Sequence, residues 1–271
     1  MRGEVLSLGW TRVRVRRERP TAVALAIALC VTMLVVYVLT LDLKGPDVVE
    51  SMAAAPRVTR EIDFEPLEGW CVVMAICESP QQARLMASAW VGRGAAGYVA
   101  ELEDGWAVVG AVYDGEKEAR RVAKRLNDDE GIPAEATRLS AEGVRLRITA
   151  PQAQIEAVAG ADALLREQTR QLGEAALQLD RGDMSADAAR TLCALSAREA
   201  REAGQRLAAI PGAAENGLCS GLIERLNALS GALDAVSNGG ASAGAAFSGM
   251  LRCAQAENFI GQWRLLKGLK G

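Results

Sequence analysis

The chain has 271 residues, enough for one or two globular cores, and its 31 Lys and Arg against 34 Asp and Glu give a net charge of -3. This balance gives no reason to expect a nucleic-acid partner, because backbone binding needs a clustered basic face. The sequence contains no histidine, which excludes serine–histidine and cysteine–histidine catalysis and every histidine-ligated metal site.

An uncharged stretch near the start of the chain predicts a membrane anchor. Residues 21–41 (TAVALAIALCVTMLVVYVLTL) would span about 31 Å as a helix, which matches a bilayer core. Five arginines lie within residues 12–19, so the positive-inside rule places residues 1–20 in the cytoplasm and residues 42–271 outside. A cleaved signal peptide, with its site at residues 53–55 (AAA), is the alternative, but the apolar run is long for one.

The segment that follows the anchor has the composition of a linker. Residues 42–68 contain Pro46, Pro56 and Pro66 among scattered charges, which predicts a tether that holds the outer part off the membrane. Apolar runs that alternate with helical stretches begin at residue 69, where we place the start of the first outer domain.

A nine-residue string is written twice in this domain, as GWCVVMAIC at residues 69–77 and as GWAVVGAVY at residues 105–113. Each copy predicts a strand, and a helical stretch and a second short strand follow it. An A-R-x-x-A pattern in the helices also recurs 36 residues later (Ala83, Arg84, Ala87 and Ala119, Arg120, Ala123). This tandem predicts a four-stranded, mostly antiparallel sheet with both helices on one face, as in ferredoxin-like folds.

The doubled strand, with its A-R-x-x-A helix and a glycine before the next strand, resembles the sporulation-related repeat (SPOR) domain over residues 69–140. Trp70 and Trp106 stand where that family begins its first and third strands with an aromatic residue. Val73 stands where the family often has glutamine, and Ala107 where it often has arginine. The resemblance implies a module outside a single membrane anchor that binds peptidoglycan glycan strands stripped of stem peptides, often at division or sporulation septa.

Strand alternation predicts which side chains lie under the helices. The bulky set expected there is Trp70, Val72, Met74, Ile76, Tyr98, Ala100, Leu102, Trp106, Val108, Ile132 and Ala134. The opposite face would show the smaller set Cys71, Val73, Ala75, Glu101, Val109, Ala111, Glu135 and Thr137.

This second face has two interpretations. In one, Glu101, Glu135 and Thr137 form hydrogen bonds with glycan hydroxyls over a floor made by Val73 and Val109. In the other, a different part of the chain or a partner protein covers the floor, and the glutamates are ordinary surface charge.

The rest of the chain predicts one further strand and then helices. Residues 142–150 alternate apolar side chains with Arg145 and Arg147 as a strand does. From residue 151 the composition favours helices, and apolar residues recur every seven positions at Val158, Leu165, Leu172 and Leu179. The Arg181-Gly182-Asp183 triplet is interpreted as a helix stop and not as an adhesion motif. Three more amphipathic helices, marked by Leu192 to Ile210, Leu218 to Val236 and Phe247 to Leu266, complete a predicted four-helix assembly.

The six cysteines are expected to be free thiols. Cys71 and Cys77 lie on one predicted strand and cannot pair with each other. Cys193, Cys219 and Cys253 fall one to a helix among apolar neighbours, as buried thiols do. Disulfides, which an extracellular location permits, are the alternative. Without histidine or a C-x-x-C motif, we expect no metal site.

The expected fold class is therefore α+β, with a transmembrane helix, a ferredoxin-like SPOR domain at residues 69–150 and an all-α helical bundle at residues 151–271. The expected function is non-catalytic binding of peptidoglycan glycan strands by a single-pass membrane protein of the cell envelope, acting in division or sporulation. A scaffold that only binds partner proteins is the alternative, and an envelope hydrolase is a third interpretation. We expect no enzyme activity, cofactor or nucleic acid, and we expect envelope proteins as further partners.

Overall fold

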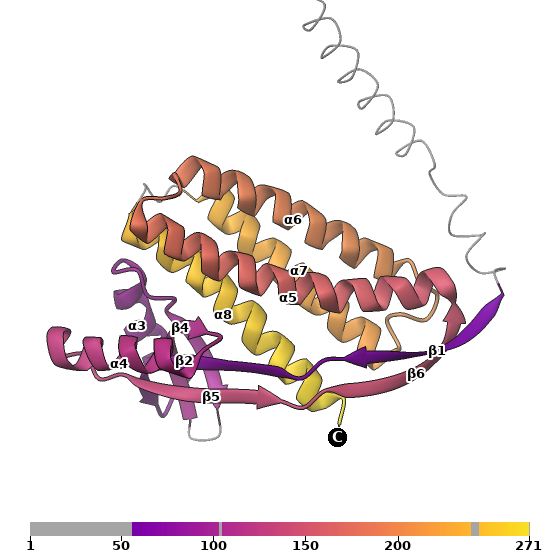
Figure 1. The fold of residues 1–271 in the computed structure, drawn as a ribbon, viewed down its shortest axis with the longest axis horizontal. Helices are drawn as coiled ribbons and strands as arrows, with labels where there is room; N and C mark the ends of the chain where they lie inside the picture. Colours follow the sequence, from indigo (N-terminus) through magenta and orange to yellow (C-terminus); the bar gives the residue numbers. More distant parts are fainter. Residues whose placement is uncertain (1–55, 103–104, 240–243, 271) are drawn as a thin grey trace, which may run out of the picture. The chain divides into compact units, whose positions relative to one another are not determined.

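The computed structural model describes residues 56–102, 105–239 and 244–270, which belong to one compact unit. Its elements in chain order are β1 (Arg57–Phe64), β2 (Leu67–Cys77), α3 (Pro80–Val91), β3 (Tyr98–Leu102), β4 (Gly105–Tyr113), α4 (Glu116–Glu130), β5 (Glu135–Ala141), β6 (Val144–Pro151), α5 (Gln152–Arg181), α6 (Ala186–Ala208), α7 (Gly217–Asn238) and α8 (Ala245–Gly268) (Figure 1).

The repeated half of the chain forms a four-stranded antiparallel sheet in the order β3-β4-β2-β5. α3 and α4 pack on one face of this sheet through small side chains, which let the helices approach closely. These are Ala83 and Ala87 of α3 and Ala119 and Ala123 of α4, all buried. The alanines of the repeated A-R-x-x-A pattern are therefore the contacts between helix and sheet in both copies.

The helix ends follow local rules. The Ser79 side chain accepts a hydrogen bond from the Gln82 main-chain N–H at 3.3 Å, and Pro80 occupies the first turn of α3. Gly182 ends α5 with φ of 76°, a left-handed conformation that glycine adopts without strain. The interpretation of Arg181-Gly182-Asp183 as a helix stop is confirmed.

A β-bulge in β2 changes which residues face the helices. Val73 pairs with Val109 and Ala75 pairs with the preceding residue, Val108, so Met74 is an extra residue on this strand. Beyond the bulge, Ala75 and not Met74 joins the apolar cluster under α3. Ile76, predicted to lie under the helices, is 56% exposed.

The prediction for β3 was also wrong, because its side chains point to the faces of the sheet opposite to those predicted. Its residues Tyr98, Ala100 and Leu102 contact the large core on the side away from α3 and α4. Simple alternation, counted from the first strand, therefore fails wherever a bulge or a turn changes which alternate residues face the helices.

A second, two-stranded sheet joins β1 and β6, with Arg57 opposite Pro151 and Phe64 opposite Val144. Residues 57–64 fall inside the segment predicted to be a linker. β1 continues toward β2 and β5 toward β6, so the two sheets share one long pair of chain segments (Figure 1). We call the two-stranded sheet of β1 and β6 the ribbon. One side of it packs on the large core through Val58, Ile62, Val144, Leu146 and Ile148.

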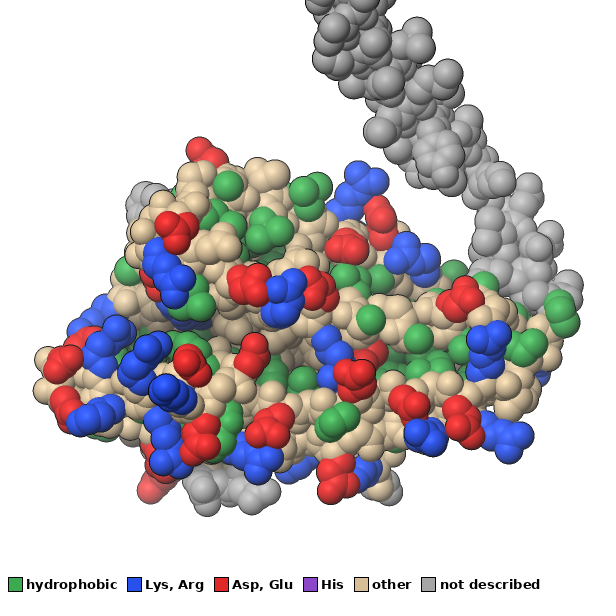
Figure 2. All heavy atoms as spheres, in the orientation of Figure 1, with side chains coloured by type: hydrophobic (Ala, Val, Ile, Leu, Met, Phe, Trp, Pro, Cys, Tyr) green, Lys and Arg blue, Asp and Glu red, His purple; other side chains and the backbone are tan. Residues whose placement is uncertain are grey.

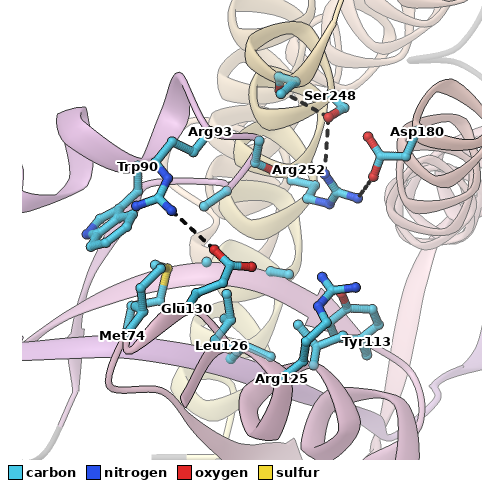
Figure 3. Close-up of a pocket in the computed structure, with 18 of the residues that line it drawn as sticks. Met74, Trp90, Arg93, Tyr113, Arg125, Leu126, Glu130, Asp180, Ser248 and Arg252 are labelled. Carbon is cyan, nitrogen blue, oxygen red and sulfur yellow. Dashed lines mark hydrogen bonds and ion pairs between the residues drawn. The ribbon is translucent and has the colours of Figure 1, made fainter. Parts of the chain in front are cut away.

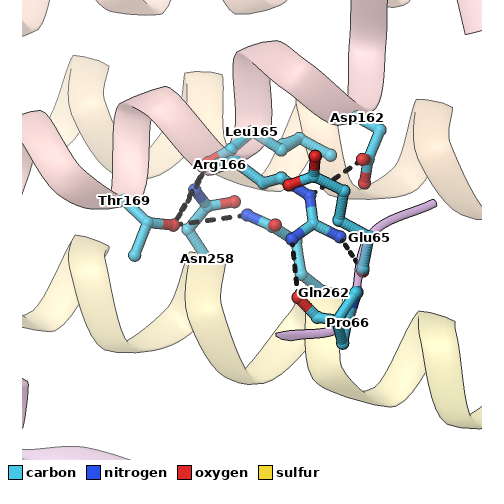
Figure 4. Close-up of polar contacts among 8 residues, drawn as sticks. All are labelled: Glu65, Pro66, Asp162, Leu165, Arg166, Thr169, Asn258 and Gln262. Carbon is cyan, nitrogen blue, oxygen red and sulfur yellow. Dashed lines mark hydrogen bonds and ion pairs between the residues drawn. The ribbon is translucent and has the colours of Figure 1, made fainter. Parts of the chain in front are cut away.

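Arg166 of α5 holds the junction between β1 and β2. Its guanidinium donates hydrogen bonds to the main-chain oxygens of Glu65 at 2.6 Å and Pro66 at 3.3 Å (Figure 4). It also pairs with Asp162 at 2.8 Å, and its side chain is 21% exposed. The step from the ribbon to the main sheet is therefore fixed on the surface of α5.

The four long helices α5 to α8 lie together as predicted (Figure 1). Val158, Leu165 and Leu172, which recur every seven residues, are buried along α5. Ser185 and Asn216 cap α6 and α7 by accepting hydrogen bonds from the main-chain N–H groups of Ala188 and Cys219.

The predicted fold class, taken as a whole, is wrong. The described residues form six helices and two small sheets in a single unit, and α8 packs on the second face of the main sheet, for which the sequence left an open and a covered interpretation. The physical reason for this packing is that the second face of the sheet is apolar, so in water another element must pack on it. Within the described ranges, no helix is both long and apolar enough to span a bilayer. The predicted span at residues 21–41 lies outside the described residues.

Candidate functional site

The five residues predicted to bind glycan are not brought together on one surface. Val73 and Val109 pair with each other in the sheet and are buried beneath the helical half, which consists of α5 to α8, with exposures of 6% and 0%. These two valines therefore form no floor for a sugar chain at the surface.

The three polar residues of the predicted site lie on opposite edges and faces of the sheet. Glu135 and Thr137 are on edge strand β5, opposite Val73 and Cys71, so they belong to the face that the helical half covers. Glu101 is on the other edge strand, β3, opposite Trp106, which packs in the apolar cluster under α3. A single short glycan cannot contact all three in the manner predicted.

α8 is the element that covers the predicted glycan face. Trp263 donates its Nε1–H to the Ser140 main-chain oxygen of β5 at 3.0 Å. Arg264 donates to the main-chain oxygen of Glu101 in β3 at 3.2 Å. Gln255 reaches the Val112 oxygen of β4 at 3.4 Å. Hydrogen bonds from side chains of one helix thus reach three of the four strands, and the interpretation that another part of the chain covers this face is confirmed.

The cover is a permanent part of the core. Most of α8 is buried, including the large apolar side chains of Phe247, Leu251, Phe259, Ile260, Trp263 and Leu266. A helix with so many large apolar side chains buried is part of the protein interior. Burying each such side chain contributes about 1.5–3 kcal/mol, so the six together contribute about 9–18 kcal/mol, which is comparable to a typical domain's whole stability of about 5–15 kcal/mol.

Buried amides set the position of α8 against α5. Asn258 donates to the Leu165 main-chain oxygen at 2.7 Å and to the Thr169 hydroxyl at 2.8 Å, and Gln262 donates to the same hydroxyl at 3.3 Å (Figure 4). Each bond requires a particular register between the two helices, because a buried amide loses its partner on sliding. The surface of α8 that faces the sheet is thereby fixed.

A cleft of about 470 Å³ opens on the opposite face of the sheet, between α3 and α4. Val72, Met74 and Ala111 of the sheet and Leu126 of α4 form its apolar floor. The cleft exists because α3 and α4 pack on two separate apolar clusters, which leaves the middle of this face uncovered.

The rim of the cleft carries two ion pairs that join different elements (Figure 3). Arg93, which follows α3, donates to Glu130 of α4 at 3.2 Å, and its guanidinium lies 4.9 Å from the centroid of the Trp90 ring. Arg252 of α8 pairs with Asp180 of α5 and donates to the Gly94 main-chain oxygen at 2.8 Å. These pairs hold the sides of the cleft in place.

A third arginine at the rim has no such partner. Arg125 of α4 lies beside Tyr113, and within the described ranges it pairs with no carboxylate (Figure 3). Burial raises the pKa of Tyr113, so its hydroxyl keeps its proton at neutral pH. That hydroxyl also has no hydrogen-bond partner among the residues that the structure describes. Lys and Arg side chains gather over α4 on this side of the unit, with Asp and Glu among them (Figure 2).

The five cysteines in the described ranges are free thiols, as predicted, and Cys253 alone among them is half-exposed. Burial raises the pKa of Cys71 to about 12 and that of Cys193 to about 11. Burial, with a smaller effect of Glu257, raises the pKa of Cys253 to about 11. These three thiols are therefore protonated and weakly nucleophilic at neutral pH. Cys30 lies outside the described residues.

The chain matches no protein-family model, no curated protein and no solved structure.

Proposed function

We propose that this protein is a non-catalytic scaffold of the cell envelope, which binds partner proteins through its outer surfaces. The observation that carries this proposal is the packing of α8 on the sheet, because the face that a SPOR-like module would offer to glycan is part of the core. The placement in the envelope rests on the sequence alone, on residues 21–41 and the arginines before them.

The helical half supports a role in protein contacts. The two sheets and the helices α5 to α8 share one core and form a single unit, so surfaces on different elements keep a fixed spacing. Two large apolar side chains are mostly exposed on the surface of the unit, Leu85 of α3 at 75% and Leu195 of α6 at 63%. Contiguous apolar surface marks sites of protein binding, so these two positions are the ones at which to probe for a partner.

A wall-binding experiment separates the scaffold from a glycan-binding protein. The full chain is incubated with intact cell wall and with amidase-stripped wall, and both are pelleted. We expect equal, low amounts of protein in both pellets. Enrichment on stripped wall would contradict the proposal, and its loss in a Glu101→Ala, Glu135→Ala variant would then place the glycan at the residues predicted from the sequence.

The positive test uses photo-crosslinking in intact cells. A photoreactive residue replaces Leu85 or Leu195, and in the matched control it replaces Lys117, an exposed charged residue of α4. We expect discrete protein adducts from at least one leucine position and none from Lys117. Absence of adducts from both leucine positions would overturn the scaffold proposal.

Glycan binding is the second candidate, and a specific feature favours it. Glu135 is exposed and Thr137 half-buried on the edge strand β5, where a sugar chain could lie along the margin of the sheet without entering the covered face. The wall-binding experiment decides between the two candidates.

A further inference from the structure

The cleft between α3 and α4 combines features that the scaffold proposal does not use. Its volume of about 470 Å³ falls in the range of small-ligand sites, roughly 300–1,000 Å³. Both ion pairs at its rim join side chains of this protein, so the elements around the cleft are linked without a ligand.

The charges at the rim favour an anion. Two of the three arginines, Arg93 and Arg252, have carboxylate partners there, whereas Arg125 has none among the described residues. A carboxylate that entered the cleft would find the Arg125 guanidinium and the Tyr113 hydroxyl on the same side (Figure 3). Guanidinium groups bind carboxylates in a two-pronged arrangement that is stronger than a neutral hydrogen bond.

The floor favours an apolar group next to that anion. Val72, Met74 and Leu126 offer only carbon and sulfur atoms from their side chains, and water in contact with them gains no hydrogen bonds. An apolar side chain or short alkyl group would replace this water while the attached carboxylate stays at the rim.

We propose that this cleft binds a ligand with an apolar group adjacent to a carboxylate. Two sources share that chemistry, the carboxyl terminus of a peptide that ends in an apolar residue and a free short-chain carboxylic acid. The proposal does not depend on the scaffold role, since a ligand of either source could bind whether or not the outer leucines contact other proteins.

The test measures binding of soluble probes to the full chain by saturation-transfer NMR. The probes are N-acetyl-Gly-Leu and hexanoate, each compared with its uncharged amide. We expect at least one carboxylate to bind and its amide to bind at least about tenfold more weakly. Binding of the peptide alone would identify a chain terminus as the source, and binding of hexanoate alone would identify a free acid.

Two variants locate the probe. Arg125→Gln is expected to weaken binding of the carboxylate about tenfold, and Tyr113→Phe to weaken it by a smaller factor. Arg120→Gln is the matched control, because Arg120 is on the same helix but pairs with Glu116 and does not line the cleft. The proposal is overturned if neither carboxylate binds at millimolar concentration, if acid and amide bind equally, or if Arg120→Gln weakens binding as much as Arg125→Gln.

Discussion

Phe259 of α8 lies directly against Gly69 of β2, and a Cβ added to Gly69 would stand 2.4 Å from the ring. The main chain of the strand is thus the surface on which the ring rests. Gly105, which occupies the same place in the second copy of the repeat, meets a different requirement, because its φ is 130°. One repeated glycine therefore allows a close approach in the first copy and a special backbone conformation in the second.

The first prediction concerns this contact. Gly69→Ala should destabilise the protein by about 1–3 kcal/mol, since the ring or the strand must move to admit a methyl group. The free energy of unfolding is measured by urea denaturation. Gly160→Ala is the matched control in α5, where an added Cβ meets nothing within 4 Å, and it should stabilise by about 0.5–1 kcal/mol. Shifts of the same sign would show that the contact does not determine the effect.

The second prediction concerns the hydrogen bond between α8 and the sheet edge. Trp263→Phe keeps an aromatic ring but removes the donor to the Ser140 main-chain oxygen. We expect a loss of about 0.5–1.5 kcal/mol in the free energy of unfolding. Trp90→Phe serves as the comparison, because the Trp90 indole nitrogen has no hydrogen bond within the described ranges. An equal loss in both variants would assign the effect to ring size.

The third prediction concerns the arginine at the strand junction. Arg166→Lys keeps the charge but cannot donate to Glu65, Pro66 and Asp162 together, so we expect a loss of about 1.5–3 kcal/mol. Hydrogen exchange of the main-chain amides at the ends of β1 and β2 should quicken as well. Arg170→Lys, an exposed arginine with two carboxylate partners, should cost at most about 1 kcal/mol. Unchanged exchange at the junction in Arg166→Lys would refute this role.

The fourth prediction concerns alkaline pH. The thiol of Cys71 has a folded-state pKa of about 12, against 9.0 without burial. Because the unfolded thiol ionises first, the stability that Cys71 contributes is complete below about pH 9 and declines as pH rises toward 12. Urea midpoints should therefore fall between pH 8.5 and pH 10.5, roughly the window where only the unfolded thiol ionises. The decline should be shallower in Cys71→Ala, and an identical slope in that variant would contradict the assignment.

Local sequence signals predicted the elements of the repeat but not their surroundings. The doubled strings at residues 69–77 and 105–113 form β2 and β4, and the alanines of the repeated pattern are the helix contacts. The pairing of β1 with β6 escaped prediction, because it joins Thr59 to Thr149, and nothing local to residues 57–64 indicates so distant a partner.

The sequence predicted the candidate site only in part, again because local patterns do not indicate contacts between distant segments. Alternation placed Val73 and Val109 on one face correctly, but it could not say what would cover that face. One signal was present in α8, where small and apolar residues such as Gly249, Ala256 and Gly261 leave no continuous polar side, as in a helix buried all round. The cleft had no such signal, since Arg93, Arg125 and Arg252 are far apart in the sequence and come together only in the folded chain.

The position of α8 in the chain has a consequence for biosynthesis. The residues joined by the Gln255–Val112 and Trp263–Ser140 hydrogen bonds are 143 and 123 residues apart. A growing polypeptide therefore completes the sheet strands well before the helix that covers them, and during that interval the apolar face containing Cys71, Val73 and Val109 is open to aggregation. Chains interrupted before residue 245 would keep this face exposed, which makes them recognisable to chaperones and proteases as unfinished.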